Sequence, residues 1–244
     1  MWTPETNIKD NLTLWITHEC NMNCVFCRDS NHKTIKGFMS LTDVEHNLKI
    51  AKDSGIKTVL IGGGEPTLHP NIIEIAKLCK QFNFFTVITT NYTKPEIIKQ
   101  LDGIIDTINI SLYEENKESI PNQSDFQSTL CLKVLIYSGR WKNKKEFDEF
   151  IDFYKQKIPN IVFGCMRGHT TWCKEHNKVE WLSEIEKEST ITQTSRGNPA
   201  YTYRGCYIDR KDLADRHERH MMVDTRGFIF DKNGETVLSK RALC

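Results

Sequence analysis

The sequence contains no long apolar run. Hydrophobic residues make up 39% of its 244 residues and fall in short segments separated by charges. None of these segments approaches the roughly 20 apolar residues that a membrane helix needs. The N-terminal stretch MWTPETNIKDN also lacks the basic start and apolar core of a signal peptide. We therefore expect a cytoplasmic protein with no membrane partner.

A strong net charge is also absent. The 33 Lys and Arg residues nearly balance the 32 Asp and Glu residues, which leaves a net charge of +1. This balance gives no overall attraction to nucleic acid, so we do not expect nucleic acid as a partner. The chain shows no internal repeat and no low-complexity segment, and its length suits one large domain or one domain with a small appendage.

Cysteine, by contrast, is plentiful, with 9 residues. In a chain of this size without a signal peptide, cysteines are better interpreted as metal ligands or free thiols than as disulfides. Cys20, Cys24 and Cys27 lie close together in the stretch THECNMNCVFC. A [4Fe-4S] cluster takes four cysteine ligands, and this stretch offers three. If a cluster binds here, one iron is left open to a small-molecule ligand.

A second motif, GGGEP at residues 62–66, directly follows the apolar run 57–61. That arrangement predicts a buried strand whose carboxyl end opens into a functional loop. We expect the glycines to be needed because a side chain there would keep the backbone from approaching a ligand. An ordinary glycine turn before a helix is the alternative interpretation.

The two motifs together resemble those of the radical S-adenosylmethionine (SAM) enzymes, over about residues 10–165. In that family three cysteines after the first barrel strand hold a [4Fe-4S] cluster, and a Gly-Gly-Glu-Pro element after the second strand clamps the amino group of SAM. The resemblance implies that Cys20, Cys24 and Cys27 are metal ligands, and that a [4Fe-4S] cluster and SAM are the cofactors. It also implies a SAM site that comprises Phe26 near the adenine, Gly63, Gly64, Glu65, Pro66, Asn91 and Ser111.

Each of these assignments has a simpler alternative. A structural zinc site, with His18 or His69 as fourth ligand, would also use three cysteines. Phe26 could be a packing residue, and Asn91 could cap or turn the chain.

Six predicted strands alternate with helices along the first two thirds of the chain. A capping-box-like start at Ser40, with Asp43 three residues on, predicts a helix that ends before Gly55. The alternation favours parallel βα units, and the resemblance implies an α/β fold with a partial (βα)6 TIM-like barrel over residues 1–165. The expected strands are 11–17, 57–61, 84–90, 106–112, 129–137 and 160–165, and the expected helices are 41–54, 70–80, 94–101 and 143–157.

The pattern changes after residue 165. Residues 178–188 predict a helix, residues 190–206 look irregular, and residues 220–240 read as strands joined by turns at 225–227 and 231–234. We expect residues 166–244 to form a C-terminal α+β extension that caps the barrel on the substrate side.

A second group of four cysteines comprises the last residue of the predicted barrel and three residues of the extension. Cys165, Cys173, Cys206 and Cys244 would suffice for an auxiliary iron-sulfur cluster, although their spacing matches no compact motif. Buried free thiols are the alternative. Cys79 and Cys131 lie within helix and strand patterns and are expected in the core.

Arginines and tyrosines are interleaved in the same region. Arginine suits carboxylate and phosphate groups, so Arg196, Arg204 and Arg210 are candidate contacts for an anionic substrate. The stretch DRKDLADRHERH alternates in sign, however, which is also typical of a solvated helix face.

The resemblance implies an enzyme that cleaves SAM reductively to a 5'-deoxyadenosyl radical and abstracts a hydrogen from a small polar or nucleotide-derived substrate. An electron donor such as flavodoxin or ferredoxin would be its protein partner. A glycyl-radical-enzyme activase and a peptide-modifying enzyme remain alternatives. The ten residues before the first predicted strand do not favour a leader-binding domain. Outside the family, a non-catalytic zinc or redox-sensing protein is the competing hypothesis.

Overall fold

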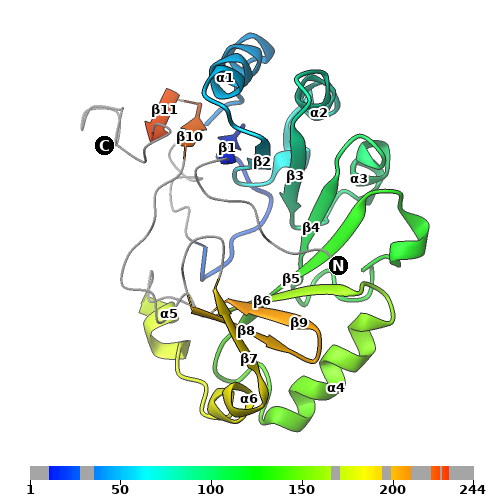
Figure 1. Cartoon of the computed structure of the whole chain (residues 1–244), viewed down its shortest axis with the longest axis vertical. Coiled ribbons are helices and arrows are strands. Elements are labelled where there is room, and N and C mark those ends of the chain that lie inside the picture. The colour runs from blue at the N-terminus through cyan, green and yellow to red at the C-terminus, as the bar shows by residue number, and fades with distance from the viewer. Residues whose placement is uncertain are drawn as a thin grey trace.

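The computed structural model describes residues 11–27, 36–165, 171–193, 199–209, 221–225 and 227–230. Within these residues the strands form a single 11-stranded sheet in the order β11-β10-β1-β2-β3-β4-β5-β6-β9-β8-β7. The sheet curls, and helices α1 to α4 cover its outer side (Figure 1). The central strands are β1 (Asn11–Trp15), β2 (Thr58–Gly62), β3 (Phe85–Thr90), β4 (Thr107–Ser111), β5 (Thr129–Ile136) and β6 (Asn160–Cys165).

The six central strands pair in sequence order, and every pair is parallel. The predicted α/β fold with six βα strands in a partial barrel is thereby confirmed. The helices between the strands begin and end close to their predicted positions. They are α1 (Leu41–Asp53), α2 (Ile72–Gln81), α3 (Pro95–Leu101) and α4 (Lys144–Lys155), with short 3-10 helices η3 (Pro66–Leu68) and η4 (Gln123–Asp125).

Strands from the last third of the chain extend both edges of this sheet. Strand β9 pairs parallel with β6, and β10 pairs parallel with β1. Strands β8 and β7 then continue antiparallel from β9, and β11 continues antiparallel from β10. The remaining elements are α5 (Thr171–His176), α6 (Leu182–Glu188), β7 (Thr190–Gln193), β8 (Pro199–Tyr203), β9 (Cys206–Asp209), β10 (Met221–Asp224) and β11 (Gly227–Phe230).

The expectation that residues 190–206 are irregular was wrong. Strands β8 and β9 are joined by Arg204 and Gly205, with φ angles of 49° and 70°. Two consecutive positive φ angles are typical of the tight hairpin turns that match the twist of a strand pair. The hairpin between β10 and β11 agrees with the predicted turn at 225–227, and the predicted turn at 231–234 lies outside the described residues.

Alternation along the central strands separates an apolar face from a polar face. In β4, Ile108 and Ile110 are fully buried in the hydrophobic core, whereas Thr107, Asn109 and Ser111 point to the other face. Figure 1 shows the helices outside the curl, so the polar face is the inner one. The inner face of β4 is therefore polar, whereas Leu60 of β2 and Val87 of β3 lie in register with Thr107 and add apolar side chains to the same face.

Local signals account for the helix ends. The Ser40 side chain accepts a hydrogen bond from the backbone N–H of Asp43 at 3.1 Å, and Gly55 follows the helix with a φ of 78°. Both features agree with the predicted start and stop of α1. No helix in the described residues is long and apolar enough to cross a membrane.

Candidate active site at the carboxyl ends of the strands

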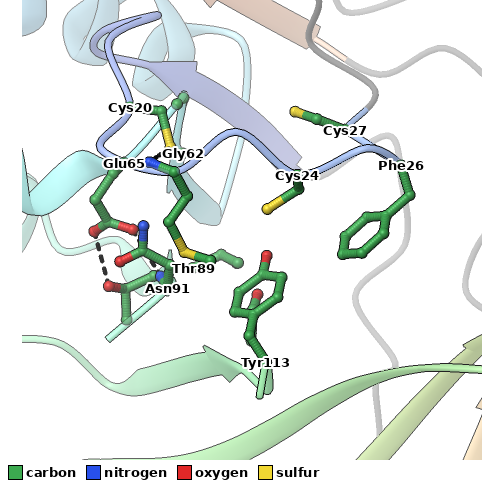
Figure 2. A pocket seen from close by; sticks show the side chains of 14 residues that line it. Cys20, Cys24, Phe26, Cys27, Gly62, Glu65, Thr89, Asn91 and Tyr113 are labelled. Carbon is green, nitrogen blue, oxygen red and sulfur yellow. Dashed lines mark hydrogen bonds between the residues drawn. The ribbon is translucent and has the colours of Figure 1, made fainter. Parts of the chain in front are cut away.

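The loops that follow β1, β2, β3 and β4 enclose a cavity of about 280 Å³. Because neighbouring parallel strands end at the same edge of the sheet, the motifs that follow them are brought together there (Figure 2). The lining residues are Cys20, Met22, Cys24, Phe26, Cys27, Gly62, Gly63, Gly64, Glu65, Thr89, Thr90, Asn91, Ser111 and Tyr113.

The three cysteines of the first motif line this cavity and are half-buried. The backbone N–H of Cys27 donates to the Cys24 carbonyl oxygen at 3.0 Å, which tightens the end of the loop. Burial raises the pKa of the Cys20 and Cys24 thiols, and charges on the neighbouring thiols raise each pKa further. The three thiols thus line one partly dry cavity, where a bound metal centre would stabilise their charged forms.

The glycine-rich loop after β2 packs directly on the chain that leads into the cysteines. The Gly64 N–H donates to the Thr17 carbonyl at 2.9 Å, and the Glu65 N–H donates to the Glu19 carbonyl at 2.8 Å. A Cβ on Gly63 would lie 2.2 Å from the Thr17 oxygen, and one on Gly64 would lie 2.2 Å from the Glu19 oxygen.

This packing corrects the expected reason for the glycines. Gly63 and Gly64 are required because two loops of the protein approach each other, and not only because a ligand must come near. Gly62 differs, since a Cβ there would meet nothing within 4 Å of the protein. It also lines the cavity, so Gly62 is the glycine whose missing side chain leaves room for a ligand.

Glu65 is a buried carboxylate, with 1% of its surface exposed. Its Oε1 accepts from the Thr67 N–H at 3.0 Å, the Thr67 hydroxyl at 2.6 Å and the Thr90 hydroxyl at 2.8 Å, and its Oε2 accepts from the Asn91 N–H at 2.7 Å. These four donors orient the group, but the described residues provide no cation for it. Its charge is held by hydrogen bonds alone and can accept an ammonium group from the cavity.

Asn91, at the end of β3, forms hydrogen bonds with several residues around the cavity. Its Nδ2 donates to Asn21 Oδ1 at 2.9 Å, and its Oδ1 accepts from the N–H and hydroxyl of Thr93 at 3.1 and 2.7 Å. The Asn116 Nδ2 in turn donates to the Asn91 carbonyl at 2.8 Å. Asn91 therefore lines the cavity, as expected of a SAM contact, and also turns the chain, as its alternative interpretation held.

Phe26 and Tyr113 form one wall of the cavity. Their rings are nearly parallel, with centroids 6.0 Å apart and an angle of 6° between the planes. The Tyr113 hydroxyl interacts with Cys24 and Ser111, and burial raises its pKa strongly. Figure 2 shows Tyr113 beneath Cys24 with Phe26 beside it. Pro66, by contrast, is buried at the start of η3 and is not among the lining residues.

The described residues contain no ready-made site for a single metal ion. In the described part of the chain, no group of three or more His, Cys, Asp or Glu side chains is placed to hold one metal ion. A cluster gives each thiol its own iron, so its ligands can be spread more widely than those of one ion. His69 is engaged elsewhere, because its Nε2 lies 2.9 Å from the Met39 carbonyl and its Nδ1 accepts from the Asn71 N–H at 3.1 Å.

Three cysteines of the second group lie in the described residues and are buried, and two of them, Cys165 and Cys206, lie apart. Cys165 ends β6, whereas Cys206 begins β9 beside the opposite end of β6. An offset of four residues along a strand, as between those two positions, spans about 13 Å. Burial raises the pKa of Cys206 to about 11, and Cys173 is buried in α5. Cys244 lies outside the described residues, and Cys79 and Cys131 are fully buried, as predicted.

Of the three candidate substrate arginines, Arg204 lies in the described residues, and it does not line the cavity. Arg204 precedes β9 and therefore lies at the amino end of the parallel strands. Its guanidinium pairs with Asp152 at 2.5 Å and with Asp148 at 3.7 Å on α4. This position does not support a substrate contact. Arg196 and Arg210 lie outside the described residues.

Some lining residues carried no recognisable sequence signal. Met22 and Tyr113 line the cavity, although Met22 is only a spacer between Cys20 and Cys24 and Tyr113 belongs to neither motif. A neighbouring cavity also includes Tyr137 and Arg140, which follow β5. The useful signal was positional, because residues just after each barrel strand reach this edge of the sheet.

The chain matches the Radical SAM superfamily over residues 16–176. It is 31% identical over 235 residues to a protein from Methanothermobacter thermautotrophicus named as a GTP 3',8-cyclase, covering 91% of this chain and 72% of that protein. It is 30% identical over 164 residues to a protein from Methanocaldococcus jannaschii named as a glycyl-radical enzyme activating enzyme. That match covers 64% of this chain and 59% of the relative, so the chain spans little more than half of that protein.

A solved structure shows the same fold. Streptococcus suis SuiB bound to S-adenosylmethionine superposes with a TM-score of 0.58 at 16% identity, covering 89% of this chain and 58% of SuiB. Members of the matched family are enzymes that use a [4Fe-4S] cluster and SAM, and their barrels are partial TIM barrels. The family match covers more than half of the sequence and includes both motifs, and the chain therefore belongs to the radical SAM superfamily.

Proposed function

We propose that Cys20, Cys24 and Cys27 ligate three irons of a [4Fe-4S] cluster and that SAM occupies the cavity beside them. The convergence of the three thiols and Glu65 on one cavity carries this proposal. When bound, a reduced cluster supplies the electron that cleaves SAM to methionine and a 5'-deoxyadenosyl radical, which abstracts hydrogen from a substrate. The chain has to bind, orient and shield these groups.

Different side chains of the cavity would bind and orient SAM. Glu65 would accept from the ammonium group of SAM, since it is a buried anion without a cation among the described residues. Gly62 leaves space for the ligand, and Asn91 and Ser111 offer polar groups to its carboxylate or ribose. Phe26 would lie against the adenine. Positioning of this kind can supply roughly 7 kcal/mol or more toward a reaction.

The substrate we propose is a small polar or nucleotide-derived molecule. The name of the Methanothermobacter thermautotrophicus relative, a GTP 3',8-cyclase, favours a nucleotide, and the polar groups of Glu65, Asn91 and Ser111 at the cavity favour a hydrophilic ligand. We further propose that residues after 165 close the site. Trp172 of α5 packs on Phe26 with ring centroids 5.9 Å apart and on Tyr137 with centroids 5.3 Å apart.

A second candidate is the activation of a glycyl-radical enzyme. The Methanocaldococcus jannaschii relative carries that name, and its match spans 64% of this chain. Such an activase would need a large protein partner in place of a small molecule. Hydrogen abstraction from a protein backbone glycine, tested with candidate partner proteins, distinguishes the two functions.

The test is anaerobic reconstitution followed by reduction with dithionite in the presence of SAM. We expect about four irons and four sulfides per chain, and release of methionine and 5'-deoxyadenosine. Cys24→Ala should lose most of the iron and at least 100-fold of the deoxyadenosine yield. Cys206→Ala, a buried thiol outside the cavity, is the matched control and should retain both. A colourless wild-type protein that binds zinc and releases no deoxyadenosine would overturn the proposal.

A further inference from the structure

A second cavity, of about 570 Å³, adjoins the proposed cofactor cavity. The two share Met22, Cys24, Phe26 and Tyr113, so any molecule in the second cavity lies next to the first. Its far side is formed by Tyr137 and Arg140, which follow β5 at the same edge of the barrel. The cavity is therefore placed to hold a substrate against the cofactor.

Arg140 has few partners for a partly buried charge. Among the described residues its guanidinium makes one hydrogen bond, from Nη1 to the Leu135 carbonyl at 3.1 Å. The guanidinium carbon also lies 5.5 Å from the Tyr137 ring centroid and 5.0 Å from that of Trp141. A guanidinium carries five N–H donors, so most of its hydrogen-bonding capacity is unused by this part of the chain.

No carboxylate in the described residues forms an ion pair with Arg140. Glu114 and Glu115 both line this cavity, and Glu114 is the one that acts electrostatically on Arg140 but pairs with Lys117 at 2.9 Å. Burial lowers the pKa of Arg140, which reflects the loss of water around its charge. A charge removed from water without a counter-ion destabilises a protein unless something else compensates it.

We propose that Arg140 binds an anionic group of the substrate, a carboxylate or a phosphate, and thereby holds the substrate beside the Cys24 and Phe26 side of the cofactor cavity. The planar fork of arginine matches both groups with two parallel hydrogen bonds. The rings of Tyr137 and Trp141 hold the guanidinium in place. This inference rests on the proposed function, because it places the anion relative to the SAM cavity.

The test is calorimetric titration of the reconstituted, SAM-loaded and unreduced protein with pyrophosphate and, separately, with malonate. We expect wild-type protein to bind one of the two, and the arm that binds identifies phosphate or carboxylate as the recognised group. Arg140→Gln should weaken that binding by about 10-fold to 100-fold, the loss expected for a charged hydrogen-bond donor. Arg140→Lys keeps the positive charge but not the planar fork, so its affinity for the anion should lie between those of wild type and Arg140→Gln.

Arg204→Gln is the matched control and should bind the anion as wild type does. Binding of SAM and release of deoxyadenosine without substrate, measured for each variant, report whether the proposed cofactor site is intact. If Arg140→Gln changes SAM binding or deoxyadenosine release, the anion affinity of Arg140→Lys is used in its place. Wild-type protein that binds neither anion, or variants at Arg140 that bind it unchanged, would overturn the subsite. If the proteins also release no deoxyadenosine, the proposed function fails separately.

Discussion

Two regions of the molecule differ in whether their charged side chains have ion-pair partners. Where α4 meets the turn between β8 and β9, Lys144, Asp148, Asp152 and Arg204 form a cluster in which each charge has an oppositely charged neighbour within 4 Å. At the cavity edge, Glu65 is fully buried and Arg140 is half-buried, yet neither has an ion-pair partner in the described residues. The charges of the α4 cluster are paired within the described residues, whereas we propose that the charges at the cavity edge gain their partners from bound ligands.

The contrast also indicates which region contributes to stability and which to binding. Ion pairs at a surface contribute on the order of 0–1 kcal/mol, because water competes for the same charges. Buried charges without partners reduce stability, and they persist where binding a ligand requires them. We therefore expect substitutions at the cavity edge to change binding strongly, and substitutions in the α4 cluster to change little. The predictions below are ordered by the size of their expected effects.

The largest effect is expected for Glu65→Gln. The substitution removes the charge and places an amide NH₂ group among donors that include the Asn91 N–H and the Thr90 hydroxyl. We expect SAM affinity, measured by equilibrium dialysis, to fall at least 30-fold, since a charged hydrogen bond contributes about 1.5–3 kcal/mol and an unpaired buried donor adds to the loss. Unchanged affinity would show that Glu65 does not meet the ammonium group.

A pair of glycine variants should separate packing from binding. In Gly64→Ala the new Cβ would lie 2.2 Å from the Glu19 oxygen, so the loops must move apart. We expect a loss of about 1–3 kcal/mol in the free energy of unfolding, as for other overpacked sites. In Gly62→Ala no protein atom lies within 4 Å of the new Cβ, so stability should be nearly unchanged.

Gly62→Ala should nevertheless weaken SAM binding, because its methyl group enters the cavity. Denaturant unfolding and SAM titration of both variants measure the two effects. If Gly62→Ala binds SAM as wild type does, the cavity wall at β2 is not a contact surface for the cofactor.

The smallest effect is expected for Arg204→Gln in the α4 cluster. Asp152 keeps its exposure to solvent and Asp148 keeps Lys144 at 3.0 Å, so both acids remain stabilised. We expect the free energy of unfolding to fall by less than about 1 kcal/mol. SAM binding and deoxyadenosine release should not change. A clear loss of either would contradict the division between the two regions.

Local patterns were sufficient to predict much of this structure. The capping residue Ser40, the stop at Gly55 and the short apolar runs each carry their signal within a few residues, so the strands and helices of the barrel were predicted closely. The two motifs lie at the ends of consecutive strands. Parallel pairing therefore brings them together without further information.

The sequence did not reveal features that depend on distant pairing. Nothing near residue 206 indicates that β9 joins β6 in parallel, and this pairing places Arg204 at the end of the barrel opposite the cavity. Arg140 was missed for the same reason, because its role depends on which strand it follows and on what faces it across the barrel. The β7 to β9 strands were missed because they are short and start at residues such as Pro199, which suggest a loop.

The central claim is that three thiols of this chain hold a cluster with an iron that accepts SAM. Electron paramagnetic resonance of the reduced, reconstituted protein with ¹⁵N-labelled methionyl SAM tests it most directly. We expect the cluster signal to shift when SAM is added and to show hyperfine coupling to the labelled amino nitrogen. A reduced cluster whose spectrum is the same with and without SAM would contradict the account.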